Sequence, residues 1–160
     1  MLWRMPSDTS ARARDPHASR AAVPPRRLLV AVLLTGLVLA AVDAVWLGVV
    51  SGDLYRNEIG HLLADSFDPV AAVAFYVVYV LGLVHFVVRP GLGRPTLAPS
   101  LRDAAAFGVV TYATFDLTSM AVMEDFPARV VVIDITWGAI LCTLTTAIVL
   151  TVMRRTRIDH

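Results

Sequence analysis

The chain has 160 residues, of which 57% are hydrophobic, and its mean hydropathy is +0.67. This apolar share exceeds that of an average soluble domain, so we expect one integral membrane domain in contact with the lipid bilayer. All 14 basic residues are Arg, which excludes a cofactor bound through Lys. A net charge of +1 gives no reason to expect a nucleic-acid partner. The single Cys142 excludes an intramolecular disulfide and a CxxC motif.

An Arg-rich segment at residues 1–27 lacks apolar periodicity and is predicted to be a disordered cytoplasmic tail. Four apolar segments follow, each long enough to cross a hydrocarbon core of about 30 Å as a helix. We expect a transmembrane domain at 28–153, with helices at 28–50, 69–88, 101–123 and 130–152, and a basic cytoplasmic tail at 154–160. A soluble bundle is disfavoured because these segments have no charged outer face. The predicted fold is an all-α integral membrane four-helix bundle.

Arg residues are distributed unequally around the four segments. Twelve lie in the N-terminal tail, around the second connection and at the C-terminus, which all fall on one side of the membrane. Only Arg56 and Arg129 fall on the other side. Because Arg and Lys accumulate in cytoplasmic loops, both termini are predicted to be cytoplasmic.

The first outer connection contains a short amphipathic segment between the first two helices. Its apolar residues fall on one helical face: Leu54, Tyr55, Ile59, Leu62 and Leu63. We expect this segment either to lie along the outer membrane surface or to fold over the bundle as a lid. The candidate lid residues are Tyr55, Arg56, Glu58 and His61.

Three carboxylates interrupt the apolar segments: Asp43, Asp116 and Asp134. With the predicted orientation, all three lie in the outer half of the membrane. Near the bilayer centre, together they would cost on the order of 7–10 kcal/mol of insertion free energy. Burial and mutual repulsion disfavour three charges, so we expect one carboxyl group to be protonated at neutral pH. The candidate polar site comprises Asp43, Trp46, Tyr112, Asp116, Thr118, Asp134 and Trp137.

Two of these carboxylates occur in the same local pattern, Asp-x-x-Trp. Asp43 precedes Trp46 and Asp134 precedes Trp137, and each Trp lies on the same helix face as its Asp. Because the two helices run in opposite directions, the pattern suggests an inverted repeat of the kind found in transporters. The alternative is that each Trp only anchors its helix at the membrane interface.

Small residues at intervals of four mark three of the four helices. They allow close backbone approach, so we expect the first, third and fourth helices to pack together. The three stripes are Gly36, Ala40, Ala44 and Gly48; Ala104, Gly108, Tyr112 and Asp116; and Asp134, Gly138, Cys142 and Thr146.

Other site chemistries find little support in the sequence. Three Asp residues with an outer His could ligate a divalent ion, but no closely spaced His or Glu ligands accompany them. No metal site is therefore predicted. There is no phosphate-binding Gly loop and no dinucleotide fingerprint, so no cofactor is predicted either.

Blocks in every segment resemble one known family. They are DAVWLGVV (43–50), LYRNEIGHLLA (54–64), AFYVVYVLGLVHFVVRP (74–90), TYATFDLT (111–118) and VIDITWGAI (132–140). These blocks are similar to a bacterial family of small membrane proteins named domain of unknown function 2177. The resemblance covers about residues 28–150 and implies four transmembrane helices in the bacterial inner (plasma) membrane. It implies no activity.

Three kinds of function remain open. The first is binding or proton-linked translocation of an unidentified small solute or lipid headgroup. A homodimer is then expected because four short helices barely enclose a path. The second is a membrane-embedded enzyme in which Asp116 and a partner perform acid–base chemistry on a lipid or isoprenoid. The third is a structural or assembly subunit whose Asp residues only hydrogen-bond hydroxyl groups across helices.

Overall fold

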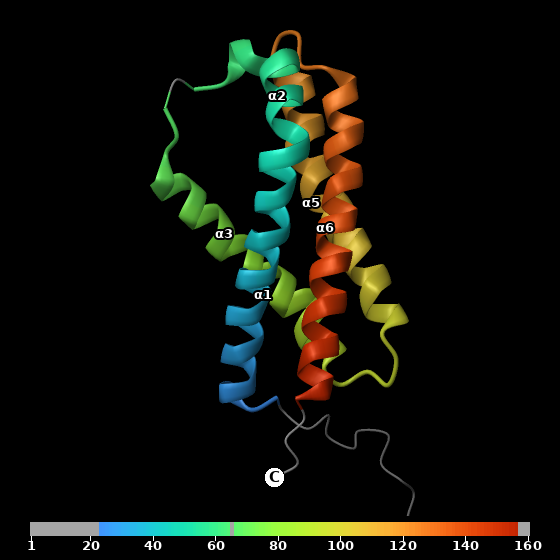
Figure 1. Ribbon diagram of the computed structural model, residues 1–160. Helices are drawn as coiled ribbons and strands as arrows, with labels where there is room; N and C mark the ends of the chain where they lie inside the picture. Colours follow the sequence, from blue (N-terminus) through green and yellow to red (C-terminus); the bar gives the residue numbers. More distant parts are fainter. Residues whose placement is uncertain (1–22, 65, 157–160) are drawn as a thin grey trace, which may run out of the picture.

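The computed structural model describes residues 23–64 and 66–156, and these residues form a bundle of long helices (Figure 1). Four helices in this part of the chain are long and apolar enough to cross a membrane: Pro25–Val49, Pro69–Gly91, Ala98–Val122 and Ala128–Arg155. No strand occurs among the described residues. The predicted all-α four-helix membrane bundle is confirmed. The predicted tails fall mostly on residues 1–22 and 157–160, which lie outside the described residues.

The first helix continues beyond its apolar part. α1 (Pro25–Val45) begins with a Pro in its first turn, where the missing N–H costs nothing. It passes through a π-helical segment (Trp46–Ser51) directly into α2 (Gly52–Ile59), and a short 3₁₀ turn ends the helix. The amphipathic segment is therefore an extension of α1, stacked above it in Figure 1. A π-helical turn holds more residues than an α-turn, so it changes which side of α2 faces the bundle.

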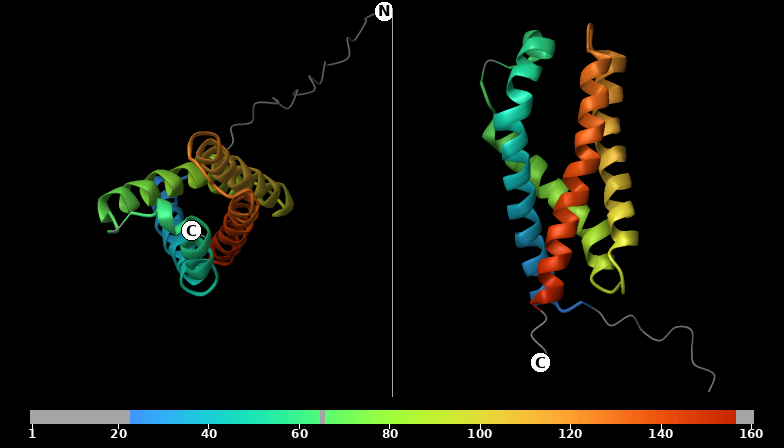
Figure 2. Two further views of the ribbon diagram at one scale, coloured as in Figure 1. Left: turned by 90° about the horizontal axis from the view of Figure 1, so that it is seen from above. Right: turned by 45° about the vertical axis from the view of Figure 1, so that its right-hand side comes forward.

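The second transmembrane helix lies partly apart from the others. α3 (Pro69–Leu83) is capped at its N-terminus by Asp68. The Asp68 carboxylate accepts hydrogen bonds from the backbone N–H groups of Val70 and Ala71. It continues through a π-helical segment (Val84–Val88) into the short α4 (Arg89–Gly91). The first half of α3 diverges from the bundle in both Figure 1 and Figure 2, and its buried residues begin only at Tyr79.

α5 (Ala98–Val122) and α6 (Ala128–Arg155) lie side by side along most of their length (Figure 2). Their backbones touch at two glycines. A Cβ atom on Gly108 would lie 2.1 Å from the carbonyl oxygen of Gly138. No side chain fits there, so the close packing predicted for these two helices is confirmed.

α1 also packs against α6, as predicted, but the stripe predicted to make this contact is wrong. Ala40, Ala44 and Gly48 are exposed, and Gly36 is only half-buried. The buried face of α1 is instead a neighbouring stripe: Ala31, Thr35, Leu39 and Asp43. Both stripes repeat every four residues in a helix that is apolar almost all round, so spacing alone could not identify the packed face.

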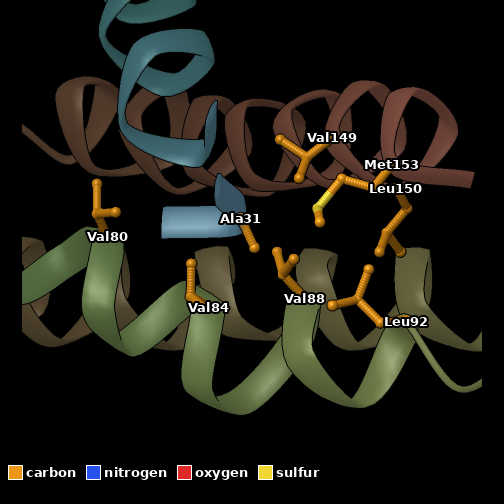
Figure 3. Packing of buried hydrophobic residues seen from close by; sticks show 8 residues of the cluster. All are labelled: Ala31, Val80, Val84, Val88, Leu92, Val149, Leu150 and Met153. Atoms are coloured by element: carbon orange, nitrogen blue, oxygen red, sulfur yellow. The ribbon is translucent and has the colours of Figure 1, made fainter. Parts of the chain in front are cut away.

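The end of the bundle that holds the start of α1 and the end of α6 has an apolar core (Figures 1 and 3). The buried cluster comes from α1, the second transmembrane helix and α6: Ala31, Val80, Val84, Val88, Leu92, Val149, Leu150 and Met153. We call this the inner end, because the Arg distribution predicts that it faces the cytoplasm. The opposite end, with α2 and the turn between α5 and α6, is the outer end.

Arg154 on α6 links this helix to the connection between α4 and α5 at the inner end. Its guanidinium donates hydrogen bonds to the carbonyl oxygens of Gly91, Arg94 and Thr96, at 3.0–3.3 Å. A guanidinium has five N–H donors in a fixed fork, so one side chain can satisfy several carbonyls at the end of α4 and in the connection after it.

Candidate intramembrane polar site

The three intramembrane carboxylates are buried in the half of the bundle nearer α2. Asp43 lies on α1, Asp116 on α5 and Asp134 on α6. Each carboxylate therefore lies on a different helix, and all three are at the same end of the bundle. The carboxylates differ in their hydrogen-bond partners, however, and these partners define their chemistry.

Asp43 accepts two hydrogen bonds from other helices. The hydroxyl of Tyr76 on α3 donates to its Oδ2 at 2.5 Å, and the indole Nε1 of Trp137 on α6 donates to its Oδ1 at 3.3 Å. The ring of Trp137 also stacks on that of Trp46, with 4.4 Å between centroids and 8° between planes. The two Asp-x-x-Trp motifs thus meet between antiparallel helices. Asp43 serves there as an acceptor that joins α1, α3 and α6.

Asp134 accepts a hydrogen bond from α2. The hydroxyl of Tyr55 donates to its Oδ1 at 2.5 Å. Burial, followed by this hydrogen bond, raises the pKa of the Tyr55 phenol above its ordinary value; the nearby charge of Asp116 contributes less. Tyr55 therefore stays protonated at neutral pH and acts as a donor. The continuous helix from α1 into α2 is what carries its side chain to α6.

Asp116 differs from the other two carboxylates. Its side chain is 0% exposed, and neither carboxyl oxygen has a hydrogen-bond partner among the described residues. Its charge nevertheless reaches the Tyr55 phenol on α2. An unpartnered buried carboxyl group is costly, and native proteins rarely keep one without a functional reason.

A groove of about 420 Å³ opens beside Asp134 and Tyr55. Six of its ten lining residues are aromatic, and they come from α2, α3, α5 and the turn before α6. The lining residues are Tyr55, Ile59, Leu63, Phe75, Tyr79, Thr111, Tyr112, Phe115, Phe126 and Asp134. The volume is in the range of pockets that hold small organic ligands. Phe75 and Phe115 are exposed on the outside of the bundle, so the groove opens sideways between α3 and α5.

Several predicted residues do not reach the carboxylates. Thr118 is exposed, and its hydroxyl donates to the carbonyls of Thr114 and Phe115 on its own helix. Arg56 and His61 are also exposed. Glu58 instead accepts a hydrogen bond from Arg129 at 3.1 Å, and both residues line a separate hollow of about 390 Å³. Of the four candidate lid residues, only Tyr55 contacts the polar site.

Two tyrosines of α3 were missed by the sequence reasoning. Tyr76 binds Asp43, and the hydroxyl of Tyr79 lies 3.0 Å from the Thr111 hydroxyl and 3.1 Å from the Cys142 sulfur. The spacing of the two tyrosines in the sequence could have identified them. Two hydroxyl groups three residues apart share one face of an otherwise apolar helix, where each needs a partner.

Tyr112 lies where α5 crosses α6. A Cβ atom on Gly138 would lie 2.3 Å from its ring, so the glycine leaves the space that the ring occupies. The ring also meets that of Tyr79 edge to face, with 6.4 Å between centroids. Tyr112 therefore forms part of the groove wall between Asp116 and the inner end.

Within the described residues, no group of three or more His, Cys, Asp or Glu side chains is arranged to hold a metal ion. A family model described as "Predicted membrane protein (DUF2177)" matches residues 28–151. No curated protein and no solved structure matches the chain.

Proposed function

Because the chain belongs to the DUF2177 family of predicted membrane proteins, whose description states no activity, we infer its function from the site. This multi-pass membrane protein binds a small solute or a lipid headgroup at the outer-half carboxylates and couples that binding to a proton. We further propose that it resides in the bacterial inner membrane, as the family resemblance implies.

Asp116 is the observation that carries this proposal. A structural role accounts for Asp43 and Asp134, since each accepts a tyrosine hydroxyl from another helix. It does not account for Asp116, which is buried and has no partner among the described residues. A carboxyl group in this position is ready to exchange a proton for a ligand, because either one removes the cost of its buried charge.

The groove brings a ligand close to this carboxyl group. It is lined by Tyr55, Asp134 and Phe115, the residue before Asp116, and it opens between α3 and α5. The first half of α3 packs weakly, with no buried residue before Tyr79. A ligand dissolved in the membrane can therefore enter from the side.

The proposal includes a homodimer, because four helices leave little room for an enclosed path across the membrane. Light scattering of the purified protein in detergent tests this part, with a mass of two chains as the expected result. A monomer under all detergent conditions would limit the function to binding in a laterally open groove.

The main experiment compares Asp116→Asn with Asp103→Asn in the full chain. Asp103 makes an exposed ion pair with Arg94 at the inner end, so it is a matched control remote from the site. Proton exchange is followed with a pH-sensitive dye in weakly buffered protein while octyltrimethylammonium, octan-1-ol, octyl sulfate and dihexanoyl-phosphatidylethanolamine are added separately. We expect at least one compound to exchange protons with the wild type and the Asp103 variant, and none to do so with Asp116→Asn.

Melting temperatures in detergent separate this function from the structural alternative. Asn removes the buried ionisable group with little change in shape, so Asp116→Asn should melt at the same temperature as the wild type or higher. A clear decrease, with no proton exchange in the wild type, would favour a structural role. Chemical conversion of an added lipid that requires Asp116 would favour the acid–base enzyme.

A further inference from the structure

The polar site has acidic groups without basic counterparts. Asp43, Asp116 and Asp134 are buried in the same half of the bundle, and no Arg or His is among the described residues that line the groove at Asp134. Arg129, the basic residue at the outer end of α6, is 70% exposed and pairs with Glu58 beside a different hollow. An uncompensated set of carboxylates in a low-dielectric region favours a cation and repels an anion.

The groove wall has the second property of a cation site. Five aromatic residues line the groove together with Asp134 and Tyr55: Phe75, Tyr79, Tyr112, Phe115 and Phe126. The face of an aromatic ring attracts an ammonium group, and the attraction is stronger where water is excluded. The same rings, with Ile59 and Leu63, offer an apolar surface to the rest of a ligand.

Because the described groove wall contains no basic residue, it favours a cationic solute over a ligand that carries a phosphate. A phospholipid headgroup would bring a phosphate toward the Asp134 carboxylate, and none of the described lining residues could neutralise it. A solute with a single positive charge and an apolar body meets no such repulsion. The lateral opening between α3 and α5 suits a compound that partitions into the membrane.

We propose that the groove binds a lipophilic organic monocation, with its ammonium group between the aromatic rings and the Asp134 carboxylate. Asp116, the residue after Phe115 of the groove wall, adds a buried negative charge that acts on the cation without touching it. This inference rests on the proposed function and narrows its ligand from a solute or lipid headgroup to a cationic solute. Asp116, buried and without a partner, supplies the negative charge that no other residue of the site neutralises.

Binding is measured by isothermal titration calorimetry with the full chain in phosphatidylcholine nanodiscs. The probe is octyltrimethylammonium, and octan-1-ol, octyl sulfate and dihexanoyl-phosphatidylethanolamine are the neutral, anionic and phosphate-bearing comparisons. We expect the ammonium probe to bind at least tenfold more tightly than each of the three. Asp116→Asn should remove most of this preference, and Asp103→Asn should leave it unchanged.

A second variant tests the aromatic wall without altering charge. Phe115→Leu should weaken the ammonium probe severalfold while changing octan-1-ol binding by less than twofold, because only the cation uses the ring face. Equal or tighter binding of octyl sulfate or the phospholipid would overturn the inference. If one of those compounds also exchanges protons through Asp116, the proposed function survives and only the ligand class is wrong. If the ammonium probe binds as expected but no compound exchanges protons, the ligand class holds and the proton-coupled function fails. If it neither binds preferentially nor exchanges protons, both fail.

Discussion

The inner and outer ends of this bundle are built in different ways. At the inner end, apolar side chains interlock around Ala31 and Leu150, and Arg154 satisfies three backbone carbonyls (Figure 3). At the outer end, α3 diverges, aromatic rings line an open groove, and the buried Asp116 has no hydrogen-bond partner in the described part of the chain. The inner end has the features of a stable membrane-protein core, whereas the outer end keeps costly groups that packing does not require.

This difference indicates a division of labour within one small domain. Proteins commonly give up stability where a site needs an unsatisfied group or an open cavity, and they recover it elsewhere. The inner core and the α5–α6 contact should therefore set stability, and the outer half should set binding. Substitutions can test each side of this division.

The largest effect is expected at the α5–α6 contact, which supports both halves. Gly108→Ala would place a methyl group 2.1 Å from the carbonyl oxygen of Gly138, and a backbone atom cannot move aside without separating the helices. We expect the unfolding free energy to fall by about 3 kcal/mol or more, measured by denaturant titration in mixed micelles.

Gly48→Ala is the matched control for this substitution. A Cβ atom at Gly48 meets nothing within 4 Å, and the residue is exposed. Its unfolding free energy should remain within about 0.5 kcal/mol of the wild type. Since Ala favours a helix more than Gly does, propensity cannot cause a loss, and equal losses in the two glycine variants would show that the close contact of α5 and α6 does not determine the result.

The second prediction concerns the inner core alone. Leu150 is fully buried in the inner cluster, whereas Leu144 on the same helix is 45% exposed. Leu150→Ala should lower the unfolding free energy by about 2–3 kcal/mol through the cavity it leaves, and Leu144→Ala by much less. Neither should change octyltrimethylammonium affinity in nanodiscs. A weaker affinity in Leu150→Ala at full folding would show that the two ends are coupled.

Much of the fold followed from the sequence, because length and hydropathy identify membrane helices without knowledge of their contacts. The α5 and α6 stripes were correct since each combines small residues with a carboxylate that must be buried. On α1 the stripe from Gly36 to Gly48 looked equally suitable, although most of it is exposed. The carboxylate of α1, Asp43, belongs to the adjacent stripe, and the need to bury it was the signal that identifies the packed face.

The site was only partly predictable, and the reason is geometric. Asp43, Asp116 and Asp134 could be placed in one half of the membrane from helix direction alone. Their partners could not, since the π-helical segment Trp46–Ser51 alters the direction of every α2 side chain, including Tyr55. Nor does the sequence reveal that α3 diverges, which creates the groove.

The third prediction uses pH to test the outer end. Lowering the pH from about 8 to about 5 should weaken octyltrimethylammonium binding by about tenfold, equivalent to about 1.4 kcal/mol. The sign follows from charge, because a protonated carboxyl group no longer attracts the cation while the probe keeps its charge at every pH. The ionisable groups nearest in charge interaction to Asp116 are Tyr55 on α2 and Asp134 on α6.

Tyr55 does not contribute to this pH dependence, since burial and its bond to Asp134 raise its pKa above the ordinary value. The carboxyl groups are therefore the source of the expected change. Octan-1-ol is the control ligand, and its affinity should not depend on pH. Tighter ammonium binding at acid pH would contradict the proposal that carboxylate charge holds the cation.

The smallest effects compare one hydrogen-bonding side chain from each end. Tyr55→Phe removes the donor to Asp134 but keeps the ring, and Arg154→Gln removes the guanidinium that fastens the inner connection. Each should lower the unfolding free energy by about 1 kcal/mol. Only Tyr55→Phe should also weaken the ammonium probe severalfold, because Asp134 is then no longer held at the groove wall. If binding depends on the outer end alone, the two variants should lose similar stability but differ in their affinity for the ammonium probe. The same affinity in both variants would contradict the division of labour between the two ends.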